Sequence, residues 1–169
     1  MTVIIYDNGT FWADTQISDL DVNNNIVRTR KISKIFEISE NHAVSGAGTF
    51  RVVEAFARNL VWNLGKWRFM FLPVDGKVIG TDQTSVLEYK DGTVRVQIMT
   101  MKFFVGHLKI YRVKADRTYI RDCRIVVGSG APKATEYLDQ GFDPEDTIFL
   151  TSLTDRFTNA DIQKVEMAP

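Results

Sequence analysis

The chain has 169 residues, of which 44% are hydrophobic and 25% are charged. These proportions fit one globular domain that buries roughly 70% of the surface exposed by the unfolded chain. The 21 Lys and Arg residues balance 21 Asp and Glu residues, so no overall field attracts nucleic acid or an anionic membrane. We therefore expect neither nucleic acid nor a membrane as a partner.

Cysteine content and apolar runs bear on the compartment. Cys123 is the single cysteine in the sequence, so no internal disulfide can form. No run approaches the ~20 apolar residues of a membrane-spanning helix, and the apolar stretch 2–6 is too short for the core of a secretory signal. These features predict a cytoplasmic protein. No repeat or linker divides the sequence, so residues 1–169 are expected to form a single domain.

The first fifty residues carry the pattern of β-strands. Residues 2–6 and 10–14 flank an Asp-Asn-Gly sequence, in which Asn and Gly tolerate the positive φ angles of a tight hairpin turn. Many β-branched and aromatic residues predict two more strands, over 27–38 and 42–46. The sequence thus predicts a four-stranded opening.

A helix is predicted after Thr49, where apolar residues take up the three-and-four spacing of one helix face. Gly65 ends this pattern. The stripe consists of Val52, Val53, Phe56, Ala57, Leu60, Val61 and Leu64.

The second half of the chain returns to strands and then changes to helices. Strands are predicted over 86–98, with an Asp-Gly hairpin signal, and over 108–127. Two helices are expected next, the first ending at Gly141 and the second capped by Asp143. A final strand covers 161–167. This order predicts an α+β fold in which helices cover the faces of packed sheets.

Thr2 stands at the start of the first predicted strand. Once Met1 is removed, its own α-amino group, with a pKa of about 7.7–8.0 in model compounds, can accept the hydroxyl proton. An amine next to the hydroxyl activates threonine, which is otherwise a weak nucleophile. A threonine that merely begins a strand is the alternative interpretation, and for the residue taken alone it is the more common case.

Five short motifs occur in an order that resembles one family. They are "TVIIYDNGTFWADTQIS", "RKISKIF", "VSGAGT", "VVGSGAPKA" and "LTDRFTNAD". Together, from residue 2 to about 167, they resemble the proteasome β-subunits and their bacterial relative HslV, which are N-terminal-nucleophile threonine peptidases. The resemblance implies a four-layer αββα fold of two antiparallel sheets covered by helices. It also implies endopeptidase activity without a metal or organic cofactor.

The resemblance assigns catalytic roles to several residues. Thr2 would attack a peptide carbonyl, and Asp14 would pair with Lys31, whose positive charge favours the deprotonated forms of nearby groups. Ser129 and Asp155 would hold or relay the proton of the Thr2 amine. Taken alone, Asp14 and Lys31 also fit an exposed salt bridge between two strands.

The resemblance also implies where a substrate binds. Gly46 would present its backbone N–H to the developing oxyanion, and the same residue fits a strand-to-helix turn. Val44, Ser45 and Gly48 would line a modest apolar pocket for the substrate side chain. The sequence departs from the family in the motif that contains Asp155. Asn159 and Ala160 stand there at the positions where the family commonly has Gly-Gly.

The implied partners are a peptide or an unfolded protein as substrate and further copies of the chain in a homo-oligomeric ring. An ATP-dependent unfoldase stays open as a partner. Two other functions also stay open. One is an inactive scaffold or ring-assembly protein with the same fold. The other is a phosphate-binding or nucleotide-binding module built on "RIVVGSGAPKA", which runs strand, glycine-rich turn and helix but lacks the third glycine of the dinucleotide fingerprint.

Metal chemistry has little support in the sequence. The two histidines, His42 and His107, and the one cysteine show no recognisable spacing of metal ligands. No metal site is expected.

Overall fold

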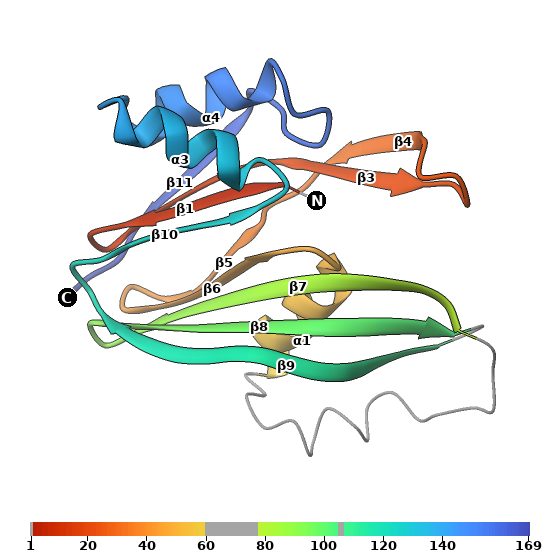
Figure 1. Cartoon of the computed structure of the whole chain (residues 1–169). Helices are drawn as coiled ribbons and strands as arrows, with labels where there is room; N and C mark the ends of the chain where they lie inside the picture. The colour runs from red at the N-terminus through yellow and green to blue at the C-terminus, as the bar shows by residue number, and fades with distance from the viewer. Residues whose placement is uncertain (1, 60–77, 105–106) are drawn as a thin grey trace.

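The computed structural model describes residues 2–59, 78–104 and 107–169. This part of the chain forms antiparallel sheets and three helices (Figure 1). The α+β class predicted from the order of the elements is confirmed.

A four-stranded sheet carries the amino-terminal end of the chain. Its strand order is β10-β1-β2-β11, and every neighbouring pair is antiparallel. The β1–β2 hairpin turns at Asn8 and Gly9, whose φ angles are 48° and 87°, so the Asn-Gly prediction is confirmed. The strand bounds are β1 Val3–Asp7, β2 Thr10–Asp14, β10 Arg124–Gly128 and β11 Ile162–Glu166.

A separate hairpin follows β2 and extends away from the main sheets (Figure 1). Its strands are β3 (Gln16–Leu20) and β4 (Ile26–Lys31). Asp21 orders the tip, because its carboxylate accepts the backbone N–H groups of Asn23 and Asn25, both at 2.8 Å. Strand β3 was not predicted, because its side chains are only partly buried and its sequence lacks a clear alternation of apolar and polar residues.

The second large sheet has five strands in the order β5-β6-β7-β8-β9. The single strand predicted over 27–38 is wrong, because the chain leaves the β3–β4 hairpin after Lys31 and β5 begins at Ile35. The predicted hairpin at Asp91 and Gly92 is confirmed, with φ angles of 47° and 85°. The strand bounds are β5 Ile35–Ser39, β6 His42–Ala47, β7 Val78–Lys90, β8 Thr93–Phe104 and β9 His107–Ile120.

The described helices are α1 (Phe50–Asn59), α3 (Ala131–Asp139) and α4 (Pro144–Ser152). The predicted cap of α4 is confirmed, because the Asp143 carboxylate accepts the Asp146 N–H at 2.8 Å. The predicted continuation of the first helix to Gly65 lies outside the described residues.

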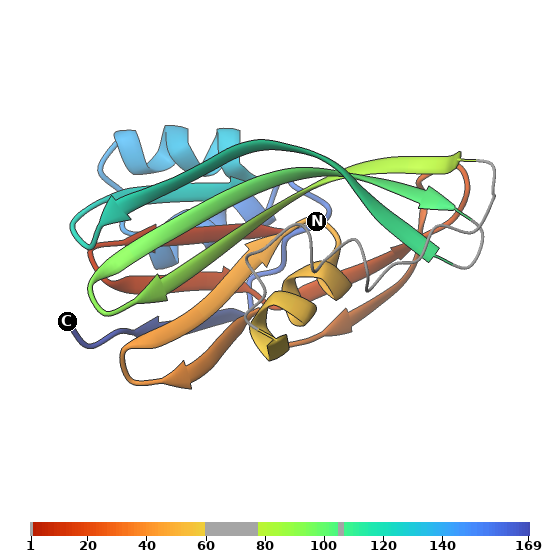
Figure 2. The ribbon, with the colours of Figure 1, turned by 90° about the horizontal axis from the view of Figure 1, so that it is seen from below.

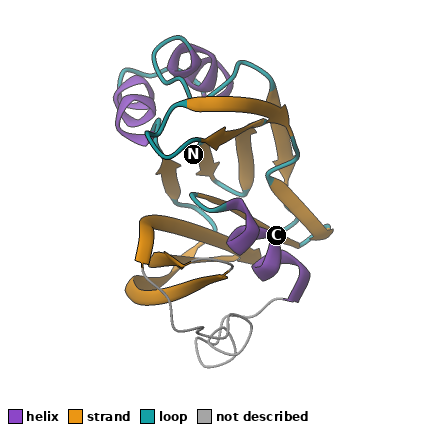
Figure 3. Cartoon of the chain, turned by 90° about the vertical axis from the view of Figure 1, so that its right-hand side faces the viewer, coloured by secondary structure: helices purple, strands orange, loops and turns teal. Residues whose placement is uncertain are grey.

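Three buried clusters hold these elements together. The largest lies between the two large sheets and includes Ile4 and Phe11 from one and Leu87 and Tyr89 from the other. A second packs α1 on the opposite face of the five-stranded sheet (Figure 2). A third packs α3 and α4 on the outer face of the four-stranded sheet, well apart from α1 (Figure 3). Within the described residues, no helix is long and apolar enough to cross a membrane.

Candidate active site

Thr2 is anchored at the beginning of β1. It is only 3% exposed, and the next residue, Val3, pairs with Gly128 of β10. Gly128 has a φ of 113°, and a Cβ built on it would lie 1.7 Å from the Thr2 carbonyl oxygen. A side chain at position 128 would therefore displace Thr2, so this glycine permits the close approach of the two strands.

Asp14 holds the Thr2 end of β1 from the neighbouring strand. Its side chain is fully buried. The carboxylate accepts the Val3 N–H and the Gln16 N–H, both at 3.0 Å, and also the Thr2 hydroxyl. Because β1 and β2 are joined by the tight Asn-Gly turn, the end of β2 necessarily comes beside the start of β1.

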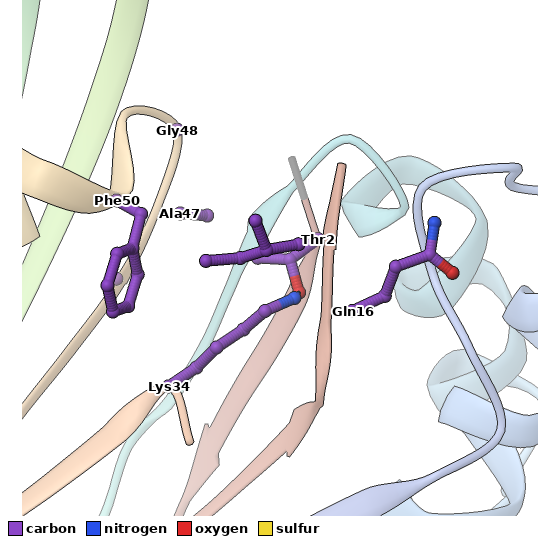
Figure 4. A pocket seen from close by; sticks show the side chains of 8 residues that line it. Thr2, Gln16, Lys34, Ala47, Gly48 and Phe50 are labelled. Carbon is purple, nitrogen blue, oxygen red and sulfur yellow. The ribbon is translucent and has the colours of Figure 1, made fainter. Parts of the chain in front are cut away.

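Lys34 completes a cluster with these two residues, and Figure 4 shows its side chain reaching Thr2. Its Nζ lies 3.0 Å from Asp14 Oδ2 and donates to Thr2 Oγ1. Only 4% of the Lys34 side chain is exposed. We refer to Thr2, Asp14 and Lys34 as the hydroxyl–carboxylate–amine cluster.

The prediction that Lys31 pairs with Asp14 is wrong. Lys31 ends β4 in the projecting hairpin, its side chain is 73% exposed, and its Nζ lies 3.3 Å from Asp161. The residue that reaches Asp14 lies three positions later. A signal for it exists in the sequence, since Lys34 is followed directly by the apolar pair Ile35 and Phe36 of a core strand, whereas Lys31 ends a run rich in basic residues.

Burial changes the acid–base properties of the cluster. Loss of hydration lowers the pKa of Lys34, and the negative charges of Asp14 and Asp155 oppose this change. Burial raises the pKa of Asp14, and Lys34 together with the backbone N–H groups opposes that change. A lysine with a lowered pKa gives up its proton more readily than an exposed lysine.

Ser129 follows Gly128 in the chain and is hydrogen-bonded to Asp155. Asp155 Oδ2 accepts the Ser129 hydroxyl at 2.8 Å and the Thr158 hydroxyl at 2.7 Å. The charge of Asp155 influences Lys34, so the predicted pair lies within electrostatic reach of the cluster. Thr158 was not among the predicted site residues.

A pocket opens beside the Thr2 hydroxyl. Its empty space, including the part open to solvent, is about 240 Å³. Figure 4 shows the Phe50 ring and Ala47 across this space from Thr2. The lining residues are Thr2, Gln16, Ile17, Lys34, Gly46, Ala47, Gly48 and Phe50.

Gly46, the predicted oxyanion donor, lines the pocket together with Gly48, one of the three predicted substrate-binding residues. A Cβ on Gly46 would approach the Ser85 carbonyl oxygen to 2.3 Å, so this position requires a glycine. The other two predicted substrate-binding residues, Val44 and Ser45, do not line the pocket. Val44 is buried in the hydrophobic core beneath α1, and the buried Ser45 hydroxyl donates to the Lys34 carbonyl at 2.9 Å. The alternation of side chains along β6 directs Val44 to the helix and Ser45 to the opposite face.

The turn before α3 is poorly suited to a phosphate. The Asp155 carboxylate lies against it and accepts the Ser129 hydroxyl, which places a negative charge where an anion would bind. Strand β10 is also antiparallel to β1, unlike the parallel strands of a βαβ nucleotide-binding unit. Across residues 2–59, 78–104 and 107–169, no three His, Cys, Asp or Glu side chains are grouped to hold a metal ion.

No protein-family model matches the chain, and no curated protein matches it either. What the chain does is therefore inferred from the chemistry of the cluster and its pocket.

Proposed function

We propose that this protein is an N-terminal threonine hydrolase that cleaves peptide bonds through Thr2. The observation that supports the proposal is the contact of the Thr2 hydroxyl with both Asp14 and Lys34, in a buried cluster that borders a pocket. A hydroxyl held against a basic group is how enzymes activate a weak nucleophile. The resemblance to proteasome β-subunits and HslV, whose nucleophile is an amino-terminal threonine, supports the same function.

The cleavage begins when a lone pair of Thr2 Oγ1 attacks the carbonyl carbon of the substrate amide. The hydroxyl proton passes to the amine of Lys34 or to the freed α-amine of Thr2. The carbonyl oxygen becomes an oxyanion, and we assign to Gly46, which lines the pocket, the backbone N–H that stabilises it. The C–N bond then breaks with its electrons on nitrogen, and the protonated amine returns the proton to this leaving group.

An ester between Thr2 and the acyl half of the substrate remains. Water attacks this ester, gives up a proton to the amine, and releases a carboxylic acid while the proton returns to Thr2 Oγ1. Ser129 and Asp155 are proposed to hold the α-amine of Thr2. That amine is basic only after Met1 has been removed, because an amide nitrogen has no basic lone pair.

The proposal extends to the fold and to assembly. We infer a four-layer αββα sandwich of the N-terminal-nucleophile type and a cytoplasmic homo-oligomeric ring that takes peptides or unfolded proteins, with an ATP-dependent unfoldase as a further candidate partner. Light scattering of a species much larger than 19.3 kDa would support the ring. A strictly monomeric solution state would contradict the ring and leave the hydrolase proposal intact.

Covalent labelling tests the central proposal. A fusion cleaved directly before Thr2 provides a free α-amine, and a peptide epoxyketone captures a hydroxyl and an adjacent amine together. We expect one adduct by intact-mass measurement and cleavage of a fluorogenic peptide. Thr2→Ala should abolish both, whereas Thr93→Ala, in the distant β8, should retain both.

The labelling experiment also distinguishes an active hydrolase from an inactive protein with the same fold. Absence of both adduct and turnover from a correctly folded protein with a free Thr2 amine would reject the hydrolase and favour the inactive scaffold or ring-assembly protein.

A further inference from the structure

The backbone that carries Lys34 lies outside any strand. Strand β4 ends at Lys31 and β5 begins at Ile35, so residues 32–34 lack the regular hydrogen bonds of a sheet. Free backbone polar groups in a buried position cost free energy unless another group satisfies them. For Lys34, that group is a side chain from a distant strand.

Gln163 of β11 supplies these hydrogen bonds. Its Oε1 accepts the N–H of Lys34 at 3.0 Å and the N–H of Ile35 at 3.1 Å. Its Nε2 donates to Ser33 Oγ at 2.7 Å and to the Ile35 carbonyl at 3.1 Å. All four hydrogen bonds go to three consecutive residues, so one carboxamide fixes the whole segment.

The carbonyl side of Lys34 is held separately. Buried Ser45 of β6 donates its hydroxyl to the Lys34 carbonyl at 2.9 Å. The Lys34 N–H is thus hydrogen-bonded to the four-stranded sheet and its carbonyl to the five-stranded sheet. The lysine lies where the two sheets meet, and each sheet contributes one side chain that holds its backbone.

We propose that Gln163 is a positioning residue for Lys34 and thereby sets the placement of the Lys34 amine against Thr2 and Asp14. This inference rests on the proposed hydrolase function for its catalytic consequence. The lysine side chain has four rotatable bonds, so its amine is fixed only if its backbone is fixed. Positional precision of a reacting group accounts for a large part of enzymatic rate, and small displacements cost about 100-fold.

Two substitutions test the inference in different ways. Gln163→Met keeps the length of the side chain and removes all four hydrogen bonds. Gln163→Glu keeps acceptors for the two N–H groups, loses the donors, and adds a negative charge near Lys34. Two further variants are controls. Ser33→Ala removes one hydrogen-bond partner of Gln163 but none of the hydrogen bonds to Lys34, and Gln140→Met changes an exposed glutamine at the end of α3.

Kinetics with a fluorogenic peptide provide the first measurement. We expect Gln163→Met to lower kcat at least tenfold with KM within about twofold, because Gln163 does not line the pocket and Lys34 is the one lining residue, of those described, to which it is hydrogen-bonded. Ser33→Ala and Gln140→Met should keep both constants within about twofold. For Gln163→Glu, the added negative charge should move the acidic limb of the kcat/KM profile to higher pH.

A second measurement does not depend on activity. Titration of ¹⁵N-labelled lysine by NMR, with the Lys34 signal assigned by its loss in Lys34→Met, reports the environment of the amine directly. We expect the Lys34 titration midpoint to move in both Gln163 variants and to stay in place in Ser33→Ala and Gln140→Met.

The two measurements keep the proposals apart. An unchanged Lys34 titration in both Gln163 variants would overturn the positioning role, whatever the activity. A shifted titration in a protein that shows no turnover even before mutation would reject the hydrolase and leave the positioning role standing. If Gln163→Met does not fold, Gln163→Asn, which shortens the side chain by one methylene group and adds no charge, takes its place in both measurements.

Discussion

At the scale of single residues, the chemistry of the site depends on the burial of one lysine. Lys34 loses its hydration in the interior, and Asp14 at 3.0 Å returns only part of that free energy, so burial lowers the pKa of Lys34. The same residue type three positions earlier, Lys31, lies 73% exposed against Asp161. An exposed ion pair of this kind contributes little to stability.

The two lysines therefore form a matched pair of variants. We expect Lys34→Met to lower kcat/KM at least 100-fold, because loss of a preorganised charged or proton-accepting group in a site costs several kcal/mol of transition-state stabilisation. Lys31→Met should stay within about twofold of the parent. Both are measured with a fluorogenic peptide on protein with a free Thr2 amine. Equal losses in the two variants would remove Lys34 from the mechanism.

The wrong prediction that Lys31, and not Lys34, pairs with Asp14 has a physical cause. Both stand in the motif "RKISKIF", and the match of this motif to a family does not show where the strand ends. Strand β4 ends at Lys31, and the Ile32 N–H donates to the Thr15 carbonyl at 2.8 Å, which turns the chain back toward the main sheets. That contact joins residues 17 positions apart and leaves no mark in the local sequence.

At the scale of elements, local signals were reliable where the local chain decides the structure. Both Asn-Gly and Asp-Gly turns form hairpins, because positive φ is a property of those residues. The β3–β4 hairpin escaped prediction because its residues are only partly buried or exposed, and the hydrophobic alternation that marks a half-buried strand is then weak.

The cap of α4 offers a test at this scale. Asp143 accepts the Asp146 N–H at 2.8 Å, so Asp143→Ala should lower the free energy of unfolding by about 1 kcal/mol. Glu145→Ala removes a charge from the same first turn without removing a cap, and its loss should be smaller, about 0.3 to 1 kcal/mol at low salt. Urea denaturation measures both. A larger loss in Glu145→Ala than in Asp143→Ala would contradict the capping role.

At the scale of the whole molecule, the site exists only where the sheets meet. Thr2 and Asp14 come from the four-stranded sheet, Lys34 leads into the five-stranded sheet, and Gln163 bridges the two. Sequence motifs could name Thr2, Asp14, Gly46, Ser129 and Asp155 as candidates, because each belongs to a short local pattern. They could not identify Gln163, whose partners lie about 130 positions away, or place Val44 beneath α1, since both depend on how the layers pack.

The buried pair also predicts how stability varies with pH. The pKa of Lys34 is lower in the folded protein than in the unfolded chain. Between those two values the unfolded chain holds a proton that the folded protein has released, so the free energy of unfolding rises with pH in that window. The reference should carry neither charge, because removing one partner leaves the other buried and uncompensated. We therefore compare the parent with the Asp14→Asn, Lys34→Met double variant.

We expect the double variant to be at least as stable as the parent at pH 7, because well-packed neutral groups often replace a buried ion pair without loss. From pH 7 toward 10, the parent should gain stability relative to the double variant, by at most about 1.4 kcal/mol for each pH unit. Urea denaturation at several pH values measures this difference, and Lys31→Met serves as the control with the slope of the parent. A parent that loses stability relative to the double variant over this range would show that Asp14 and Lys34 together hold more protons in the folded protein than in the unfolded chain. That outcome would contradict a net release of the Lys34 proton on folding.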